Sequence, residues 1–397
     1  MSEKRRGNPF EPGKPVDPEY FGGRKRELET FREYLGYSIE GNIHNLALMG
    51  ERGIGKSSLL RKFEQIASEE YGCLVIRREM DASVDSLRSL TMFMLEAAKS
   101  EGSSRLVSRK RKAAEKVTRF FERYKVGISV MGQGVSIERL ERTAAVQDYF
   151  YSELMHIWEG IREGTRGVVF LIDEAERLQG VEGSWSFLRS VLTRTSEEDA
   201  GYMLVVSGKL GLFRGIKEIF SPMGRFFTPL EVAPMKQDEV RDVLEKPLKE
   251  RSIGIASEAA RMVSEYSGGH PYIVQTFGLF AFAEAVDSPT KTVDAPMIQK
   301  VLPKVMTRLA GQVFRDRFED ASPLERRVLL AIAKGREDEV APQDISALME
   351  DGERNTAIRP ALKRLVEKDC LVKKERGTYS FFTPLFGEYV KARMTST

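Results

Sequence analysis

Short apolar runs alternate with segments of helical periodicity through the first half of the chain. Within each run, apolar residues follow one another without polar alternation, which is typical of strands buried on both faces of a sheet. Between the runs, apolar residues recur at helical spacing, as Leu28, Phe31 and Leu35 do after Arg24. Strands that alternate with helices predict an α/β domain built on a parallel sheet. The predicted strands span residues 44–50, 73–80, 167–173 and 201–208.

Residues 103–142 interrupt this alternation. The stretch SRLVSRKRKAAEKVTRFFERYK is rich in Lys and Arg and places apolar side chains at helical spacing, so it predicts a basic amphipathic helix. Its aromatic residues Phe120, Phe121 and Tyr124 are expected to pack on the core rather than stack on bases. Residues 126–138 then alternate around MGQG, which predicts a β-hairpin. We interpret 103–142 as an insertion that touches nucleic acid, an acidic partner or a neighbouring subunit, three alternatives that stay open.

The periodicity changes again towards the C-terminus. A helical segment follows the predicted sheet, and then come a linker helix, three short helices and an antiparallel hairpin. Three helices and a hairpin are the layout of a winged helix. The N-terminal residues are rich in Pro, Gly and charge and are expected to be extended rather than packed. The predicted parts are an arm at 1–20, the α/β domain at 21–233, a helical lid at 234–295, a linker helix at 296–321 and a winged helix at 322–397.

Composition limits the possible chemistry. The chain has 397 residues, 41% of them hydrophobic and 30% charged, and a formal net charge of +3. Nucleic-acid binding therefore has to be judged from local clusters of charge. Two cysteines and three histidines, far apart in the sequence, exclude a zinc framework and a disulfide scaffold. No apolar run resembles a secretion signal or a membrane span, so we expect a cytoplasmic protein without membrane contact.

The stretch ALMGERGIGKSSLL joins the first predicted strand to the helix that follows it. Gly50, Gly55, Lys56 and Ser57 fit the pattern G-x-x-x-x-G-K-[ST]. Glycines let backbone amides approach an anion, and a helix N-terminus, a lysine and a Mg²⁺-binding serine complete a phosphate cradle. The pattern predicts an ATP·Mg²⁺ site, and a purely structural glycine turn is the alternative. The predicted nucleotide-binding residues are Gly50, Glu51, Arg52, Gly53, Ile54, Gly55, Lys56, Ser57 and Ser58.

Carboxylates suited to phosphate chemistry end the third predicted strand. In VVFLIDEAERL, Asp173 is placed to hold Mg²⁺ together with Ser57, and Glu174 to accept a proton from the attacking water. The alternative is that Asp173 is a helix N-cap. Ser207 ends the next strand and is either a γ-phosphate sensor or a turn serine. Arg225, in SPMGRFF, is either an arginine finger given to a neighbouring subunit or a surface arginine.

Taken in order, FGGR, GERGIGKSS, IDEAER, VVSG, MGRFF and SGGHPY resemble an archaeal-type P-loop ATPase family. That family is similar to the origin-recognition branch of AAA+ proteins and to the STAND signalling ATPases, and it usually continues into a winged helix. The resemblance implies that FGGR borders the adenine, that GGHP lies over the nucleotide and that MGRFF carries an arginine finger. Many AAA+ lids have a sensor arginine where this chain has GGHP, a segment that also fits a helix stop and restart. The residues so implied are Phe21, Gly22, Gly23, Arg24, Gly269, His270 and Pro271.

Basic residues of the predicted winged helix are candidates for contacts with DNA phosphates. They are equally typical of a solvated helix face, and STAND-type winged helices often serve as packing modules. The candidates are Arg359, Lys363 and Arg364 on the third helix and Lys373, Lys374 and Arg376 on the hairpin.

Two classes of function follow. In the first, the protein is an ATPase that works as a homo-oligomer, with an arginine finger supplied in trans by the neighbouring subunit. Its nucleotide state sets the angle between the ATPase core and the winged helix. This angle in turn controls binding to double-stranded DNA. In the second, ATP drives a signalling or scaffold switch to oligomerise with a protein partner. A kinase is a weaker third alternative, because the sequence shows no acceptor pocket and the Asp-Glu pair indicates hydrolysis.

Overall fold

A computed structural model describes residues 7–104, 111–124, 142–212, 226–335, 339–349, 355–374 and 377–393. The chain divides into two compact units, each of which is described by itself. The sheet unit comprises Arg24–Glu51 and Gly55–Ala233. The helical unit comprises Met1–Gly23, Arg52–Ile54 and Pro234–Thr397, so the sheet unit is inserted into it along the sequence. No helix in the described ranges has the length and apolarity needed to cross a membrane.

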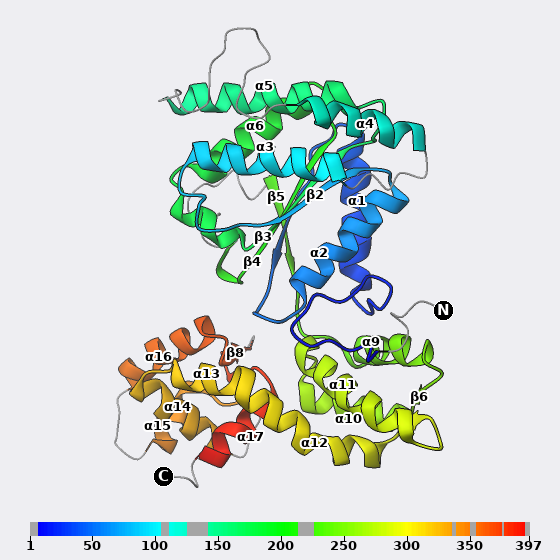
Figure 1. Cartoon of the computed structure of the whole chain (residues 1–397). Coiled ribbons are helices and arrows are strands. Elements are labelled where there is room, and N and C mark those ends of the chain that lie inside the picture. The colour runs from blue at the N-terminus through cyan, green and yellow to red at the C-terminus, as the bar shows by residue number, and fades with distance from the viewer. Residues whose placement is uncertain are drawn as a thin grey trace. The chain divides into compact units, whose positions relative to one another are not determined.

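The sheet unit is built on five parallel strands in the order β2-β3-β4-β1-β5 (Figure 1). Four of them confirm the predicted strands, and β1 and β4 are buried along their whole length. The fifth was not predicted from the sequence. It is an edge strand that contains Pro229, and proline is tolerated where a strand has a free edge. The strands are β1 Asn45–Met49, β2 Leu74–Glu79, β3 Val168–Asp173, β4 Tyr202–Gly208 and β5 Phe227–Glu231.

Helices cover this sheet. Among them, α3, α4, α5 and α6 contact one another and form one layer (Figure 1). Helices α1, α2 and α3 follow the predicted helical segments, whereas α5 and α6 were not predicted from the sequence. The elements are α1 Lys25–Ile39, α2 Lys56–Gln65 with the π-helical turn η2 Ile66–Glu70, α3 Leu87–Ser104, α4 Arg111–Arg123, α5 Thr143–Ile161, the 3₁₀ turn η4 Ala175–Gly180 and α6 Ser184–Ser196.

Helix α4 confirms the amphipathic helix of the predicted insertion, and its aromatic side chains pack as expected. Phe121 and Tyr124 are buried, and Tyr124 donates a hydrogen bond to Glu153 at 2.5 Å. A Cβ at Gly102 would lie 2.1 Å from the Phe121 ring, so this glycine lets α4 approach α3. The aromatic residues of α4 are therefore committed to the core of the sheet unit. The predicted hairpin at 126–138 lies outside the described residues.

The helical unit contains the segments that were predicted to form a lid, a linker helix and a winged helix. The winged helix has its three helices in the predicted places. Its hairpin pairs β8 with β9, and Val340 forms an additional antiparallel bridge with Tyr379 of β9. The elements are α9 Gln237–Lys249, β6 Gly254–Ile255, α10 Ser257–Ser267, α11 Pro271–Asp287, β7 Thr292–Val293, α12 Ala295–Leu309, the π-helical turn η5 Ala310–Phe314, α13 Arg315–Glu319, α14 Pro323–Lys334, α15 Pro342–Leu348, α16 Asn355–Glu367, β8 Leu371–Lys373, β9 Tyr379–Phe381 and α17 Pro384–Arg393.

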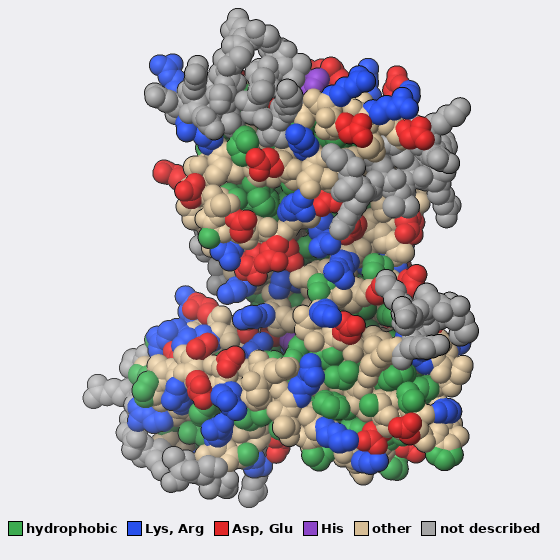
Figure 2. All heavy atoms as spheres, in the orientation of Figure 1, with side chains coloured by type: hydrophobic (Ala, Val, Ile, Leu, Met, Phe, Trp, Pro, Cys, Tyr) green, Lys and Arg blue, Asp and Glu red, His purple; other side chains and the backbone are tan. Residues whose placement is uncertain are grey.

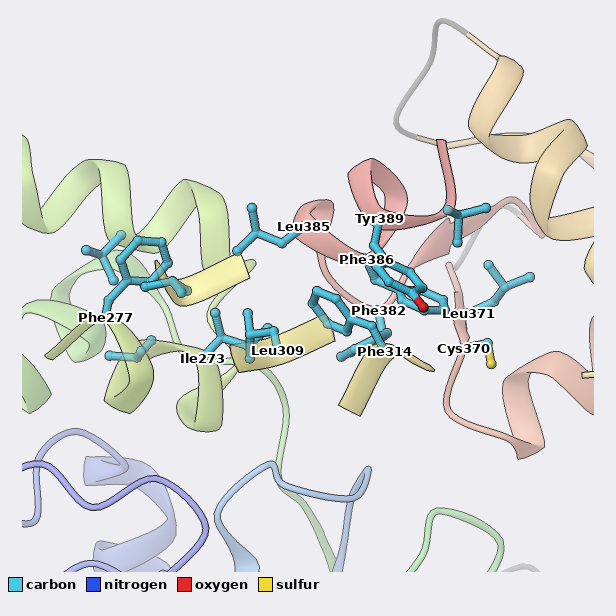
Figure 3. Packing of buried hydrophobic residues seen from close by; sticks show 14 of the residues in the cluster. Ile273, Phe277, Leu309, Phe314, Cys370, Leu371, Phe382, Leu385, Phe386 and Tyr389 are labelled. Carbon is cyan, nitrogen blue, oxygen red and sulfur yellow. The ribbon is translucent and has the colours of Figure 1, made fainter. Parts of the chain in front are cut away.

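One continuous hydrophobic core joins the lid to the winged helix (Figure 3). Phe314, at the end of η5, packs its ring against Phe382 and Phe386 of the winged helix. The Thr383 hydroxyl donates to the Tyr266 carbonyl of α10 at 3.1 Å. Lid and winged helix therefore share their packing instead of being separated by an exposed linker.

The N-terminal segment packs, contrary to the prediction of an extended, unpacked arm at 1–20. The Phe10 side chain is 1% exposed and belongs to the core of the helical unit. A Cβ at Gly278 would lie 2.4 Å from the Phe10 ring, so α11 accepts the ring only because it has glycine there. Asn8 also donates to the Leu279 carbonyl at 2.8 Å. The Pro- and Gly-rich composition predicts irregular backbone but does not reveal this single anchored aromatic residue.

Candidate functional site

The glycine loop between β1 and α2 has the backbone that its sequence requires. Gly53 and Gly55 have φ angles of 81° and 98°, in the left-handed region that glycine adopts at no steric cost. Gly55 is the N-cap of α2, so Lys56 is the first residue of the helix. Backbone amides at the start of a helix attract anions.

Lys56 lies back over this loop. Its Nζ donates hydrogen bonds to the carbonyls of Gly50 and Glu51, each at 2.9 Å. The ammonium group is thereby held beside the loop backbone rather than extended into solvent. A phosphate bound in the loop would meet this charge together with the amides of the helix start.

Two hydroxyl groups converge on Asp173 at the carboxyl edge of the sheet. The Ser57 hydroxyl of α2 donates to Oδ2 of Asp173 at 2.6 Å, and the Ser207 hydroxyl of β4 donates to Oδ1. The N-cap position of η4 is Glu174 rather than Asp173, so the N-cap alternative for Asp173 is wrong. A carboxylate beside a serine hydroxyl is the oxygen donor set with which a protein holds Mg²⁺ next to phosphates, and the two residues fit that ion.

Glu174 has an unusual backbone at this edge. Its φ and ψ angles of 55° and 36° lie in the left-handed region, which is uncommon for a residue with a side chain and clusters at functional sites. Its carboxylate is about half exposed and lies 3.5 Å from the Arg177 guanidinium. The side chain is thus accessible to solvent.

Residues 21–23 pack on the lid helix α9. The Gly23 amide donates to Asp242 at 2.7 Å, and Lys246 donates to the Phe21 carbonyl at 2.8 Å. A Cβ at Gly22 would lie 2.8 Å from the backbone of α9, so glycine permits this close approach. The FGGR segment is therefore fastened to the lid by its backbone.

Arg24, the last residue of FGGR, begins the sheet unit and is 3% exposed. Its guanidinium donates to the Ala233 carbonyl at 2.6 Å and lies 3.6 Å from Glu27. Arg24 therefore connects the two places at which the chain enters and leaves the sheet unit. This structural role accounts for its side chain, and its predicted place beside an adenine stays a prediction.

The GGHP segment is a helix stop and restart, as its sequence predicted. Helix α10 ends with Gly268 in the left-handed region, and α11 begins at Pro271. His270 is buried and its Nε2 lies 3.3 Å from the Arg52 carbonyl at the tip of the glycine loop, which groups with the helical unit. The GGHP segment thus lies against Arg52 through the imidazole of His270.

The candidate DNA-contacting residues divide into two sets. Arg359 and Lys363 on α16 and Lys373 and Lys374 on the hairpin are exposed. Arg364 is exposed too, but its guanidinium donates to the buried carboxylate of Glu325 at 2.6 Å. Basic and acidic side chains are interspersed over the surface around α14–α16 (Figure 2). Arg376 and the predicted arginine finger Arg225 lie outside the described residues.

Glu325 has a structural role that was not predicted from the sequence. It accepts hydrogen bonds from Arg364, from Lys368 at 2.7 Å and from the Ser322 amide at 2.9 Å. Ser322 and Glu325 form a capping box at the start of α14. The SPLE signature could therefore have identified Glu325 as structural, although not its cationic partners.

Acid is expected to weaken the helical unit through Glu325. Burial opposes ionisation of this carboxyl, but the hydrogen bonds from Lys368, Arg364 and the Ser322 amide outweigh it and lower its pKa to about 2. Because the folded pKa lies below the ordinary value of 4.5, the stabilisation is complete above pH 4.5 and is lost as the pH falls towards 2.

Unfolding free energies measured from pH 6 to pH 3 test this expectation. Glu325→Gln should lower stability near neutral pH by about 1.5–3 kcal/mol and flatten the acid dependence. The exposed Glu388 of α17 offers a control as Glu388→Gln. An equally steep acid loss in Glu325→Gln and in the wild type would contradict the assignment.

Comparisons with known proteins agree with this geometry. Residues 20–206 match the family described as AAA ATPase domain, and residues 311–390 match a domain family of unknown function. An uncharacterized HTH-type transcriptional regulator of Methanocaldococcus jannaschii is 24% identical over 346 residues, which cover 83% of this chain and 79% of the relative.

Solved structures resemble the whole chain. A Walker-type ATPase of Pyrococcus abyssi has a TM-score of 0.60 at 16% identity, over 94% of this chain and 96% of its own. The ORC2 protein of Aeropyrum pernix, in its ADPNP–ADP complexes, has a TM-score of 0.58 at 14% identity, over 98% of this chain and 100% of its own. At these identities the likeness shows a shared fold and no more.

Proposed function

We propose that this chain binds and hydrolyses ATP with Mg²⁺ and that its nucleotide state controls binding to double-stranded DNA, because residues 20–206 match the family described as AAA ATPase domain. The convergence of Ser57 and Ser207 on Asp173 carries the catalytic part of the proposal. The glycine loop with Lys56 completes a phosphate site at the same edge of the sheet. Bound Mg²⁺ would neutralise phosphate charge, held through Ser57 and Asp173.

Each residue of this edge then has a defined task. Lys56 binds the outer phosphates, and Glu174 accepts the proton of the attacking water. Ser207, buried at the end of β4, orients the γ-phosphate or the water. Arg225 supplies an arginine finger to a neighbouring subunit of a homo-oligomer. As the family resemblance implies, FGGR is assigned to the adenine and GGHP to the nucleotide.

DNA binding is assigned to α16 and the hairpin of the winged helix. The exposed Arg359, Lys363, Lys373 and Lys374 are available for phosphate contacts, whereas Arg364 stabilises Glu325. The Methanocaldococcus relative is named an HTH-type transcriptional regulator, which supports a DNA-binding role for this chain in general.

Reversing two exposed charges tests the DNA assignment. Lys363→Glu combined with Lys373→Glu should weaken binding to duplex DNA about tenfold or more, and should reduce the slope of log affinity against log salt by about two. Lys391→Glu makes the same charge change at an exposed lysine of α17, outside the proposed DNA-contacting residues. It is the matched control for each of the two substitutions. Unchanged affinity in the double variant would remove the winged helix from the DNA interface.

A second candidate function is an ATP-driven signalling or scaffold switch in which the winged helix only packs. Two observations favour it: Arg364 and Lys368 bind Glu325, and the winged helix shares its core with the lid. This candidate predicts that ATP raises the mass of the particle in solution, because subunits assemble. It also predicts that the protein has no affinity for DNA at low salt. Mass measurement with and without ATP, in parallel with the DNA titration, separates the two functions.

A further inference from the structure

Glu176 is a carboxylate beside this site that has no role in the functions above. It lies in η4, three residues after Asp173. Its Oε2 atom is buried, and within the described residues no group donates a hydrogen bond to it. Buried carboxylate oxygens almost always accept a hydrogen bond, because removing their charge from water is costly. This atom therefore requires a donor that is not one of the described protein groups.

The end of β4 places this oxygen next to the catalytic edge. A Cβ at Gly208 would lie 2.6 Å from Oε2 of Glu176, so the carboxylate occupies the space that a side chain would take there. Gly208 follows Ser207, whose hydroxyl donates to Asp173. The Gly208 carbonyl accepts a hydrogen bond at 3.3 Å from the amide of Gly50, the first glycine of the phosphate loop. Glu176 thus adjoins Gly208, a residue that links the end of β4 to the start of the phosphate loop.

We propose that Glu176 is a positioning residue for ATP hydrolysis, whose Oε2 accepts a hydrogen bond from a water beside Ser207. This role rests on the proposed ATPase function. The water supplies the missing donor, and the fixed carboxylate orients it at the edge where Ser207 and Asp173 meet. No proton is transferred to Glu176, because Glu174 keeps the task of the base. The glycine at 208 is then required to leave the carboxylate in place.

Steady-state kinetics and nucleotide binding test this role. Glu176→Leu, which removes the acceptor, should lower kcat about tenfold or more, because a misplaced reactant loses rate steeply. The dissociation constant for ATP should change less than twofold, since Glu176 reaches the water and not the nucleotide. Glu176→Asp, which keeps the charge, should recover part of the loss. Glu182→Gln, an exposed glutamate of the same region, is the matched control.

Gly208→Ala provides an independent test, because its new methyl group would displace the Glu176 carboxylate. It should reproduce the kcat loss, and its combination with Glu176→Leu should cause no further loss, as expected for coupled residues. Binding of ADP with aluminium fluoride should weaken in each variant while ATP binding does not. A lowered unfolding temperature with unchanged kcat, or equal losses of kcat and ATP affinity, would overturn the role. A wild-type protein that does not hydrolyse ATP contradicts the proposed function instead.

Discussion

Lys56→Ala is expected to reduce ATP hydrolysis by about a hundredfold or more and to weaken ATP binding. The lysine supplies a full positive charge to the outer phosphates at a place where donors are prearranged, and loss of one such donor has effects of about this size. Its contacts with the carbonyls of Gly50 and Glu51 show that the ammonium already lies at the loop. Phosphate release and fluorescent-nucleotide binding measure the two effects.

A control on the same helix makes this result specific. Lys62 lies on α2 and donates to Gln65 at 2.7 Å, away from the loop. Lys62→Ala removes the same charge from the same helix and should leave turnover within about twofold, because surface charges of this kind contribute little. Normal hydrolysis by Lys56→Ala would refute the whole assignment of the phosphate site, including Ser57 and Asp173.

Phe314→Ala is expected to lower the free energy of unfolding of the helical unit by about 3–5 kcal/mol, as for other fully buried phenylalanines. Phe314 is 0% exposed, and its ring packs on Phe382, Phe386 and Tyr389 of the winged helix, while its backbone continues from α12, in the predicted linker, which contacts the lid helices α10 and α11. The cavity should therefore weaken both parts at once.

Separate signals can follow the two units. Both tryptophans, Trp158 and Trp185, belong to the sheet unit, so their fluorescence reports that unit alone. Hydrogen exchange resolved by peptide should show lost protection in α10 and α11 as well as in α14 and α17. Val286→Ala, at a side chain 40% exposed on α11, should cost less than about 0.5 kcal/mol. Lost protection confined to residues 322–397 would show that the winged helix folds by itself.

The elements that the sequence predicts well are those encoded by local patterns. The glycine loop, the apolar run before Asp173 and the GGHP restart each depend on neighbours in the sequence, and the structure has all three where expected. Strand β5 was missed because Pro229 suppresses the strand signal, although the edge position tolerates it. Local rules also assign the Ser322–Glu325 capping box.

Contacts between distant residues account for what the sequence could not predict. Arg364 resembles any exposed basic residue of a helix until its distance to Glu325 is known. Phe10 stands in a segment of loop-like composition, and only the glycine at 278 reveals its place in the core. Glu176 follows the Asp173-Glu174 pair, and no local sequence pattern marks it. Its proposed role depends on its contact with Gly208, which is distant in the sequence at the end of β4.

The insertion of the sheet unit into the helical unit has a consequence for the order of folding. Asn8 and Leu279, which share a hydrogen bond, are separated by 271 positions in the chain. At ordinary rates of synthesis the N-terminal segment waits about 15–50 s before α11 is made. During this interval the complete sheet unit leaves the ribosome and can fold, whereas Phe10 has no partner. Synthesis on the ribosome therefore lets the sheet unit, which holds the proposed nucleotide site, fold first. The helical unit, whose two parts flank the sheet unit in the sequence, can assemble only afterwards.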